Sequence, residues 1–395
     1  MRTTVLISGA SIAGPALAYW LHRYGFAVTV VERAPALRPG GQAVDFKGAT
    51  HRTVLERMGI LDEIEQRRTG TTDTVLVDAD GKQVATISGD FTGGDVEILR
   101  GDLSQIMYNR TAAHCEYLFG DSISALTETG DGVYVEFERG PARTFDLVFG
   151  ADGIHSRVRG LAFGPERDFV THLGYYYCVA GASPWSEGGS RARAIAYGHN
   201  TPGKIAISGG PKAQQLYLFA SPELDYRRDD NAAQRRVVEQ VYADVAWEVP
   251  RMLGEMADFD DFYLDSISKV RMQGGYVKGR IALVGDSAYG NTLGGFGTGL
   301  AVVGAYVIAG ELAVADGDHT VAFTRYNEIM QRYAKIAGSS NAGRFLAPKT
   351  ALGIRMRDWF LDSWLFTLML NYSDNAANDI DLRDYPTLVG AKDVG

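Results

Sequence analysis

The sequence predicts an α/β protein with a Rossmann-like nucleotide-binding domain, an inserted, mainly antiparallel β-sheet domain, and helices near the C-terminal end. Two observations support this fold class. Residues 4–32 have the pattern strand, glycine turn, helix and strand, which is the βαβ unit of dinucleotide-binding folds. The strand-like runs 74–77 and 84–87 form a predicted hairpin, and residues 172–222 are rich in tyrosine, glycine and alternating apolar positions. This departure from the βαβ rhythm indicates a second sheet.

The glycine turn that follows the first strand has the residue types that a pyrophosphate site needs. Gly9 permits a tight turn, and Gly14 lets the next helix pack closely on the sheet. The start of that helix offers unpaired N–H groups and a positive dipole end. Ser11 replaces the middle glycine of the G-x-G-x-x-G pattern, and Glu32 ends the second strand, where it can accept hydrogen bonds from a ribose. The alternative is a βα turn that binds no nucleotide.

Composition indicates a globular protein of two or three domains. The chain has 395 residues, 46% hydrophobic and 22% charged, which is enough to bury a sizeable core. Its net charge of −9 argues against a nucleic-acid partner, because no basic surplus is present to neutralise phosphates. Two cysteines fit a reducing cytoplasm. No run of 18 apolar residues indicates a membrane span, and residues 1–18 fit a nucleotide turn better than a signal peptide.

Hydrophobic periodicity places the remaining elements. Helices are predicted over residues 49–66, 100–110, 231–248, 300–315, 320–338 and the apolar tail 345–371. Strands are predicted at residues 96–100, 117–119, 122–126, 133–137, 145–149, 262–272 and 279–286. We expect the tail to pack between the domains; a helix at a membrane surface is the alternative, but the tail lacks a lysine-rich face.

Three motifs far apart in the chain form a recognisable set: the N-terminal βαβ unit, Ala151-Asp152-Gly153, and Gly285-Asp286 with the glycine-rich loop 287–299. In this order they resemble the group A flavin-dependent monooxygenases, the para-hydroxybenzoate hydroxylase superfamily, over about residues 1–340. A closer resemblance, to the tetracycline destructase and aromatic polyketide hydroxylase branch, rests on residues 40–43, 96–103, 303–306 and 323–328 and on the tyrosine after Gly285-Asp286.

The resemblance implies that the chain binds FAD. Glu32 would hold the adenosine ribose, Asp286 the ribityl chain, and the helix start near Gly297 the pyrimidine edge of the flavin. Asp152-Gly153 is associated with both FAD and NAD(P)H. The cofactor-binding residues that we expect are Gly9, Ser11, Ile12, Ala13, Gly14, Glu32, Arg33, Arg100, Asp152, Gly285, Asp286, Gly295, Gly297 and Thr298.

The loop 287–299 departs from the family pattern. Tyr289 stands where the family has a histidine-like position, Phe296 where it has glutamine, and Gly299 where it has asparagine. No proline occurs between residues 287 and 300. FAD binding is still expected, with an altered environment for the flavin ring.

The implied domains are discontinuous. The FAD-binding domain would comprise residues 1–70, 96–170 and 273–340, the substrate-binding domain residues 71–95 and 171–272, and a C-terminal helical segment that bridges them residues 341–395.

The implied activity is an NAD(P)H-consuming, FAD-dependent monooxygenation with O₂. The product would be a hydroxylated aromatic, polycyclic, polyketide-like or tetracycline-like small molecule, formed through a flavin C4a-hydroperoxide. Tyr175, Tyr177 and Phe296 are expected to line the substrate pocket. An FAD-dependent dehydrogenase or reductase without oxygen insertion is one alternative, and a drug-sequestering protein without catalysis is another. No catalytic acid or base is assigned, and a monomer or weak dimer is expected.

Simpler roles remain open for several of these residues. Asp152 and Asp286 have the alternative of plain turn or helix-cap aspartates. The histidines at 155, 172 and 199 lack metal-ligand spacing, so no metal site is predicted. Ser11 and Ser287 lie outside any G-x-S-x-G pattern, so no serine nucleophile is predicted.

Overall fold

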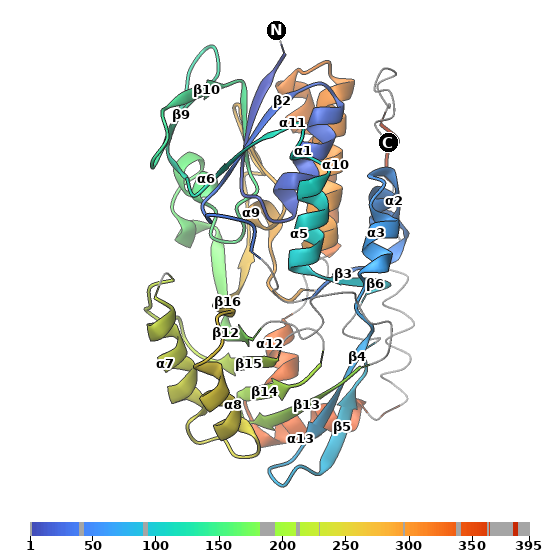
Figure 1. Ribbon diagram of the computed structural model, residues 1–395, viewed down its shortest axis with the longest axis vertical. Helices are drawn as coiled ribbons and strands as arrows, with labels where there is room; N and C mark the ends of the chain where they lie inside the picture. The colour runs from blue at the N-terminus through green and yellow to red at the C-terminus, as the bar shows by residue number, and fades with distance from the viewer. Residues whose placement is uncertain are drawn as a thin grey trace.

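The protein consists of two large sheets placed one above the other, each with its own helices (Figure 1). The computed structural model describes residues 2–38, 43–89, 94–181, 194–210, 214–228, 230–294, 297–336, 341–361, 363 and 382–385. This mixed α/β architecture confirms the predicted fold class.

The upper sheet has six strands in the order β17-β18-β11-β1-β2-β7. Its strands are β1 (Thr4–Ser8), β2 (Ala27–Glu32), β7 (Glu116–Phe119), β11 (Leu147–Gly150), β17 (Val277–Lys278) and β18 (Ile281–Leu283). All neighbouring pairs are parallel except β17 with β18. Val5, Leu6 and Ile7 of β1 have no exposed surface, as expected for a parallel strand covered on both faces.

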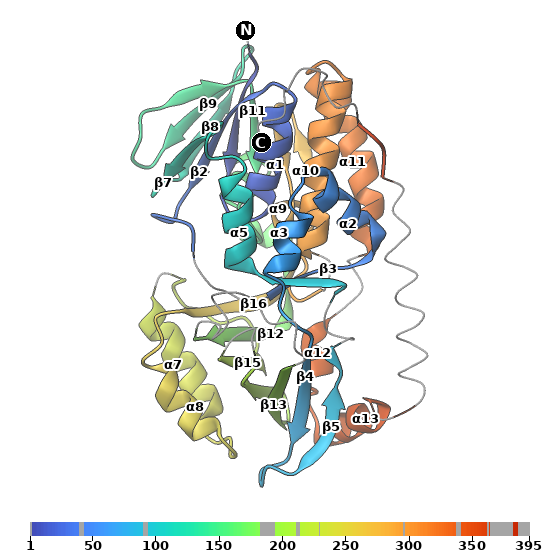
Figure 2. The same cartoon turned by 45° about the vertical axis from the view of Figure 1, so that its right-hand side comes forward.

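Helices cover one side of this sheet, and a small antiparallel sheet lies on the other (Figures 1 and 2). The helices are α1 (Ala13–Arg23), α5 (Arg100–Asn109), α10 (Gly297–Val314) and α11 (His319–Ile336), and the small sheet has the strands β8 (Ile123–Glu128), β9 (Val133–Phe137) and β10 (Arg143–Phe145). By length and composition α10 could cross a membrane, but most of its residues are buried against α1 and α11. It is the central core helix of this half.

The lower sheet has seven strands in the order β16-β12-β15-β14-β13-β4-β5, antiparallel except for the pair β13 and β4. The strands are β4 (Thr72–Val77), β5 (Gln83–Ile87), β12 (Val170–Ala180), β13 (Ala194–Thr201), β14 (Lys204–Ser208), β15 (Gln215–Ala220) and β16 (Phe262–Val270). The predicted hairpin at 74–87 is therefore present, as the pair β4 and β5.

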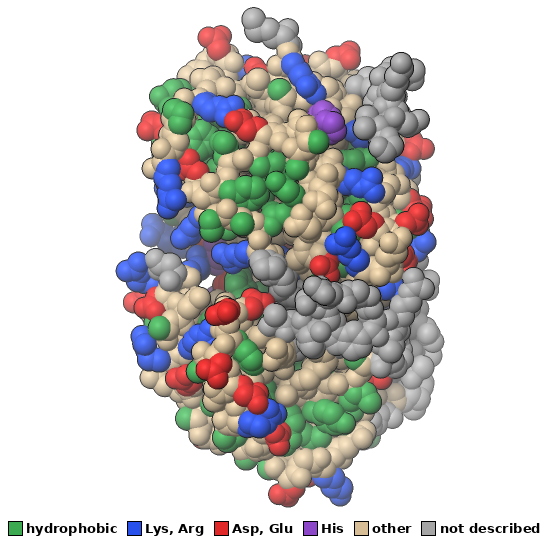
Figure 3. Space-filling model, viewed as in Figure 1, with side chains coloured by type: hydrophobic (Ala, Val, Ile, Leu, Met, Phe, Trp, Pro, Cys, Tyr) green, Lys and Arg blue, Asp and Glu red, His purple; other side chains and the backbone are tan. Residues whose placement is uncertain are grey.

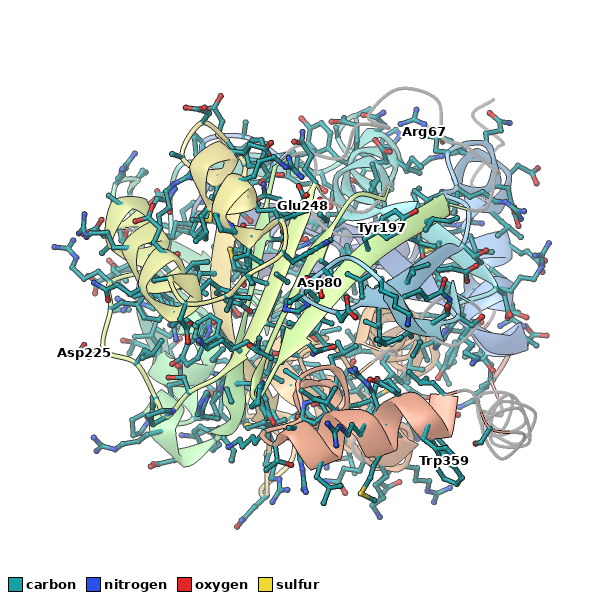
Figure 4. All side chains as sticks on the ribbon, turned by 90° about the horizontal axis from the view of Figure 1, so that it is seen from below. Arg67, Asp80, Tyr197, Asp225, Glu248 and Trp359 are labelled. Carbon is teal, nitrogen blue, oxygen red and sulfur yellow. The ribbon has the colours of Figure 1, made fainter. Side chains whose placement is uncertain are left out.

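Alternation along β12 directs its side chains to two different layers. Tyr176 packs with Phe219 and Tyr242 beneath α7 (Asn231–Tyr242) and α8 (Val249–Met256). Tyr175 and Tyr177 belong to the opposite face, where α12 (Ala342–Leu346) and α13 (Ala351–Leu361) contribute apolar side chains. Seen from below, α13 crosses the strands on the side away from α7 and α8, with Trp359 exposed on it (Figure 4).

A short strand pair, β3 (Ala43–Phe46) with β6 (Val96–Leu99), lies between the two large sheets (Figure 2). The helix predicted at 49–66 is in fact two helices, α2 (Gly48–Arg57) and α3 (Leu61–Gln66), because Gly59 adopts φ +68° between them. The helix predicted at 231–248 is likewise two, α7 and α8, with Trp247 at φ 63° between them. A left-handed residue just after the last turn ends an α-helix, as Gly59 does for α2, whereas α7 ends at Tyr242, before Trp247. Periodicity alone did not reveal either break.

The C-terminal end of the described chain is anchored to the core helix α10. Tyr385 packs against Gly310 and donates its hydroxyl hydrogen to Glu311 Oε1 at 2.8 Å, while Arg383 lies 3.2 Å from the same oxygen. Glu311 is only 1% exposed, and Arg325 approaches its other oxygen at 3.6 Å. These contacts compensate a carboxylate that is otherwise removed from water. We call this cluster of Glu311, Arg325, Arg383 and Tyr385 the C-terminal anchor.

Tyr385→Phe should destabilise the protein by about 1–3 kcal/mol, because it leaves a buried carboxylate oxygen without its phenol donor. Chemical denaturation followed by circular dichroism measures this change. Asp384→Ala is the control, since the Asp384 side chain is 87% exposed and its ion pair with Arg57 should contribute little. Equal stability of Tyr385→Phe and the wild type would show that the anchor does not stabilise the fold.

Candidate active site

Four of the predicted site segments lie at the same edge of the six-stranded sheet. Gly9 follows β1, Glu32 ends β2, Asp152 comes two residues after β11, and Gly285-Asp286 follows β18. Because these strands are parallel neighbours, their carboxyl ends meet at one edge, which is where open α/β sheets bind ligands. The structure therefore brings together motifs that are separated by more than a hundred residues.

The turn after β1 is tightly packed. Gly9 has φ +106°, and a Cβ there would lie 2.5 Å from the carbonyl oxygen of Ala151. A Cβ on Gly14 would overlap with the carbonyl oxygen of Gly9. The carboxylate of Glu32 accepts hydrogen bonds from the backbone N–H groups of Ala10 and Ala34, both at 2.8 Å. Glu32 thus fixes the turn through its backbone, and its predicted contact with a ribose stays a prediction.

Ser11 and Arg100 meet across this turn. Arg100 opens α5, directly after β6, and its Nε donates to Ser11 Oγ at 3.1 Å. The Arg100 side chain is otherwise exposed at the site edge. The serine that replaces the middle glycine of the motif therefore has a defined partner, and the pair presents a positive charge beside the start of α1.

The two predicted aspartates differ in how the protein uses them. Asp152 accepts from the backbone N–H groups of Arg157 and Val158 and from the hydroxyls of Ser156 and Ser8, and so holds the start of α6 (Arg157–Ala162). Burial raises its pKa above the ordinary value, although these donors oppose the shift. This is the turn-and-cap role that was the simpler alternative for Asp152.

Asp286 has no such partners among the residues that the structure describes. It is the first residue of α9 (Asp286–Tyr289), and its side chain is accessible to solvent. Its Oδ1 lies 3.3 Å from where a Cβ on Gly297, the first residue of α10, would stand. Burial raises the pKa of Asp286, and the Arg100 guanidinium opposes this. A carboxylate that is surrounded by protein, yet accessible and unpaired, can accept hydrogen bonds from a ligand.

Small residues let three segments converge at Asp286. Gly285 has φ +69°, and a Cβ on it would lie 3.0 Å from Ala13 of α1 and 3.2 Å from Ala301 of α10. Ala13 is buried in this contact, Ile12 is also buried, Thr298 is half-buried, and Arg33 is exposed. Gly295 and Phe296 lie outside the described residues, so the predictions for them stay predictions.

The tyrosines predicted to line a substrate pocket have different surroundings. Tyr175 is buried beneath α12, where its ring leaves no room for a Cβ on Gly343 and its hydroxyl donates to the carbonyl of Ala347. Tyr177 is buried next to Tyr263, with ring centroids 5.8 Å apart, and its phenol is within the electrostatic influence of both Arg100 and Asp286. Tyr177 therefore lies toward Arg100 and Asp286, and Tyr175 anchors a helix.

Sequence reasoning missed one cluster, which is centred on His155. Its Nδ1 lies 2.9 Å from Glu166 Oε1 and its Nε2 lies 3.1 Å from Asp265 Oδ1, on β16 of the lower sheet. Asp265 also accepts a hydrogen bond of 2.7 Å from the hydroxyl of Tyr263. Only the fold brings these residues together; the position of His155 shortly after Asp152-Gly153 was the one available signal. His155 links the loop after β11 to the second sheet.

Each charged group of this cluster shifts the pKa of its neighbours toward the charged form. Burial lowers the pKa of His155, but the hydrogen bonds to Asp265 and Glu166 outweigh burial and raise it above the ordinary value. Burial likewise raises the pKa of both carboxyls, and the bonds to His155 outweigh it and lower them. The cluster therefore favours an imidazolium between two carboxylates more strongly than the same groups would when apart.

The molecular surface is hollowed between the two halves, and Lys and Arg side chains gather along the upper margin of this hollow (Figure 3). The positive margin suits an anionic cofactor or co-substrate.

The sequence and the fold match known flavoproteins. Residues 2–322 match the family described as FAD binding domain. A flavin-dependent monooxygenase of Legionella longbeachae is 38% identical over 336 residues, covering 83% of this chain and 85% of the relative. An uncharacterized protein of Mycobacterium tuberculosis is 42% identical over 334 residues, covering 82% and 88%. The crystal structure of tetracycline destructase Tet(51) is similar with a TM-score of 0.81 at 31% identity, covering 98% of this chain and 100% of that one.

Gly14→Ala should abolish nucleotide binding or folding, because its methyl group would overlap with the carbonyl of Gly9 and push α1 off the turn. Gly160→Ala is the matched control. It changes a glycine inside α6 with nothing within 4 Å of the new methyl, so it should be neutral or slightly stabilising. Flavin content after purification and the melting temperature measure both. A Gly14→Ala protein with normal flavin content would contradict the close packing.

His155→Gln should destabilise the protein most between about pH 5 and 6.5. Because the pKa of His155 is raised in the folded state, its protonation stabilises the fold below pH 6.5, the pKa of the unfolded state, and this stabilisation is lost as the pH rises through the folded pKa. The pKa values of Asp265 and Glu166 are lowered in the folded state, so these carboxylates stabilise the fold only above 3.8 and 4.5, their pKa values in the unfolded state. We expect a difference of about 1–3 kcal/mol at pH 5.5, from two hydrogen bonds between charged groups, and less at pH 9.

Urea unfolding of the wild type and the variant at both pH values measures this difference. Asp168→Asn, at an exposed carboxylate, should have no such pH dependence. A His155→Gln deficit that is the same at pH 5.5 and pH 9 would argue against a charged histidine here.

Proposed function

The chain belongs to the FAD-binding domain family, which includes flavin-dependent monooxygenases, and from this premise we propose that it hydroxylates an aromatic, polycyclic, polyketide-like small molecule. The co-substrates would be O₂ and NAD(P)H. The observation that carries the proposal is the convergence of the Gly9–Gly14 turn, Arg100 and Asp286 at one sheet edge, beside the start of α10.

The residues at this edge fit FAD. Gly9 and Gly14 allow the close backbone packing that places the start of α1, with its unpaired N–H groups, at this edge for a pyrophosphate, and Arg100 adds a positive charge there. Asp286 is an accessible carboxylate without a partner among the described residues, which suits the hydroxyls of a sugar-like chain.

The side of the site formed by the lower sheet fits an aromatic substrate. Tyr263 on β16 is exposed and is backed by the buried Tyr177 on the neighbouring strand β12, and aromatic faces stack favourably on planar rings. The similarity to the structures of tetracycline destructases Tet(51) and Tet(55), at 31% and 32% identity, supports a tetracycline-like molecule as the first substrate to test.

The overall reaction would consume NAD(P)H, one proton and O₂, and release NAD(P)⁺, water and the hydroxylated product. FAD, when bound, supplies the activation of oxygen. The chain holds this cofactor through the turn and Asp286, orients the substrate against the β12–β16 side, and encloses both between its two halves. NAD(P)H has no second fingerprint in the sequence, so we propose that it binds transiently, at the positive margin of the hollow in Figure 3.

Both cysteines, Cys115 and Cys178, are free and buried. This supports a cytoplasmic location, where thiols stay reduced.

The first experiment is an absorption spectrum of the purified protein, followed by NADPH oxidation with and without a tetracycline. We expect a yellow protein whose NADPH oxidation rises with the drug and gives a product one oxygen heavier. Drug-dependent NADPH oxidation without an oxygenated product would favour a reductase. A protein that stays colourless after incubation with FAD would refute the proposal.

Asp286→Ala should weaken FAD binding about tenfold to a hundredfold, because hydrogen bonds to a charged acceptor contribute about 1.5–3 kcal/mol. Asp131→Ala, at an exposed turn between β8 and β9, is the control and should bind FAD as the wild type does. Titration of the apoprotein with FAD, followed by flavin fluorescence, measures both. Unchanged affinity in Asp286→Ala would remove this aspartate from the cofactor site.

A further inference from the structure

The ring of His51 fills the space that a side chain at Gly299, near the start of α10, would occupy. His51 lies on α2, is 3% exposed, and its ring covers Gly299 in the first turn of α10. A Cβ on Gly299 would overlap with three atoms of the imidazole. The family pattern has an asparagine at the position of Gly299. Glycine at this position leaves room for His51, which belongs to a distant part of the chain.

The hydrogen bonding of His51 defines its tautomer. The backbone N–H of Lys47 donates to His51 Nδ1 at 3.1 Å, so Nδ1 is an acceptor and the ring proton resides on Nε2. Burial lowers the pKa of His51 to about 4, although Asp95 opposes this, and the ring is therefore neutral at physiological pH. The ring is a fixed, uncharged N–H donor.

The Nε2–H group has no acceptor among the residues that the structure describes; the bond at Nδ1 is the one hydrogen bond of this ring there. A neutral imidazole N–H that has no partner among the described residues, next to a candidate ligand site, can donate to a ligand instead. An acceptor atom of a ligand would satisfy it.

The surroundings indicate which ligand. His51 lies at the first turn of α10, where the unpaired N–H groups and the helix dipole favour negative charge. Gly297, two residues earlier, stands beside the carboxylate of Asp286, which we assign to FAD. A donor placed here lies next to the same helix start that stands beside Asp286.

We propose that His51 contacts bound FAD, donating its Nε2–H group to an acceptor atom of the flavin ring beside the N-terminal end of α10. This inference rests on the proposed function, because it requires that FAD binds at this edge. Together, His51 and the start of α10 bind the reduced flavin, which carries more negative charge, more tightly than the oxidised flavin. His51 thus helps to set the reduction potential.

The first test measures the FAD midpoint potential in the holoenzyme by equilibration with redox dyes. His51→Leu removes the donor at similar volume, and we expect reduced FAD to lose about tenfold in affinity relative to oxidised FAD, which is a potential more negative by about 30 mV for a two-electron couple. His51→Gln keeps an N–H donor and should lie closer to the wild type.

His199→Leu is the matched control. His199 is also buried, but it lies on β13 of the other sheet, with its Nδ1 2.9 Å from the carbonyl oxygen of Val77. Its loss should change stability without moving the flavin potential, so an effect of His51→Leu on the potential is not a general effect of removing a buried histidine.

The second test uses the steric relation between positions 51 and 299. Gly299→Ala should displace the imidazole, shift the potential in the same direction as His51→Leu and weaken FAD binding. In the double variant His51→Ala with Gly299→Ala, the added methyl no longer meets a ring, so FAD affinity should recover while the potential stays shifted.

The outcomes separate the two proposals. A wild-type protein that binds no FAD refutes the proposed function and this inference together. A wild type that binds FAD, with His51→Leu at the same potential, refutes the role of His51 alone. If His51→Leu does not fold, Gly299→Ala decides: an unshifted potential in that variant also refutes the role.

Discussion

The contact between α1 and the turn that precedes it determines where every other part of the site lies. The absence of side chains at Gly9 and Gly14 lets the helix start within van der Waals distance of β1 and of the loop after β11. Gly285 repeats this arrangement where β18 meets α1 and α10. At the edge of the sheet, backbone segments from several elements therefore lie unusually close together. Such close packing can bring several helix and loop N–H groups close to one extended anionic ligand.

The second constraint is the connection between the two sheets, which is polar as well as apolar. His155 joins the loop after β11 to Asp265 on β16. Close by, the segment after α9 runs along β16, with the N–H of Val270 donating to the carbonyl of Gly290 and the N–H of Thr292 to that of Ser268. The side of the site that we assign to substrate is therefore held in register with the side assigned to cofactor. Hydrogen bonds fix the relative position of the two sheets because they are directional, whereas apolar contacts alone would let one sheet shift along the other.

Local patterns in the sequence were sufficient for the fold class, and the resemblance to the flavin-dependent monooxygenases supplied the set of segments that meet at the sheet edge. The βαβ unit, the hairpin at 74–87 and the Gly285-Asp286 turn each depend on neighbours in sequence, so their types could be predicted. The breaks at Gly59 and Trp247 could not, because both positions fit the helical periodicity. Contacts over long distances in the chain were also invisible: His155 with Asp265, Glu32 with its own turn, and His51 over Gly299 depend on packing. Asp152 and Asp286 look equivalent in sequence, and only their partners distinguish them.

The C-terminal anchor has a consequence for the order of events during synthesis. Tyr385 lies 74 positions after Glu311 in the chain, so the core helix α10 leaves the ribosome long before its phenol partner does. During that interval the nucleotide-binding half carries a carboxylate in its interior without the donor that satisfies it. Its central helix therefore reaches full stability only when residues 382–385 have been added. A translation product that ends before this point would retain every motif of the site, but its Glu311 would have only Arg325 as a partner, without Arg383 and Tyr385.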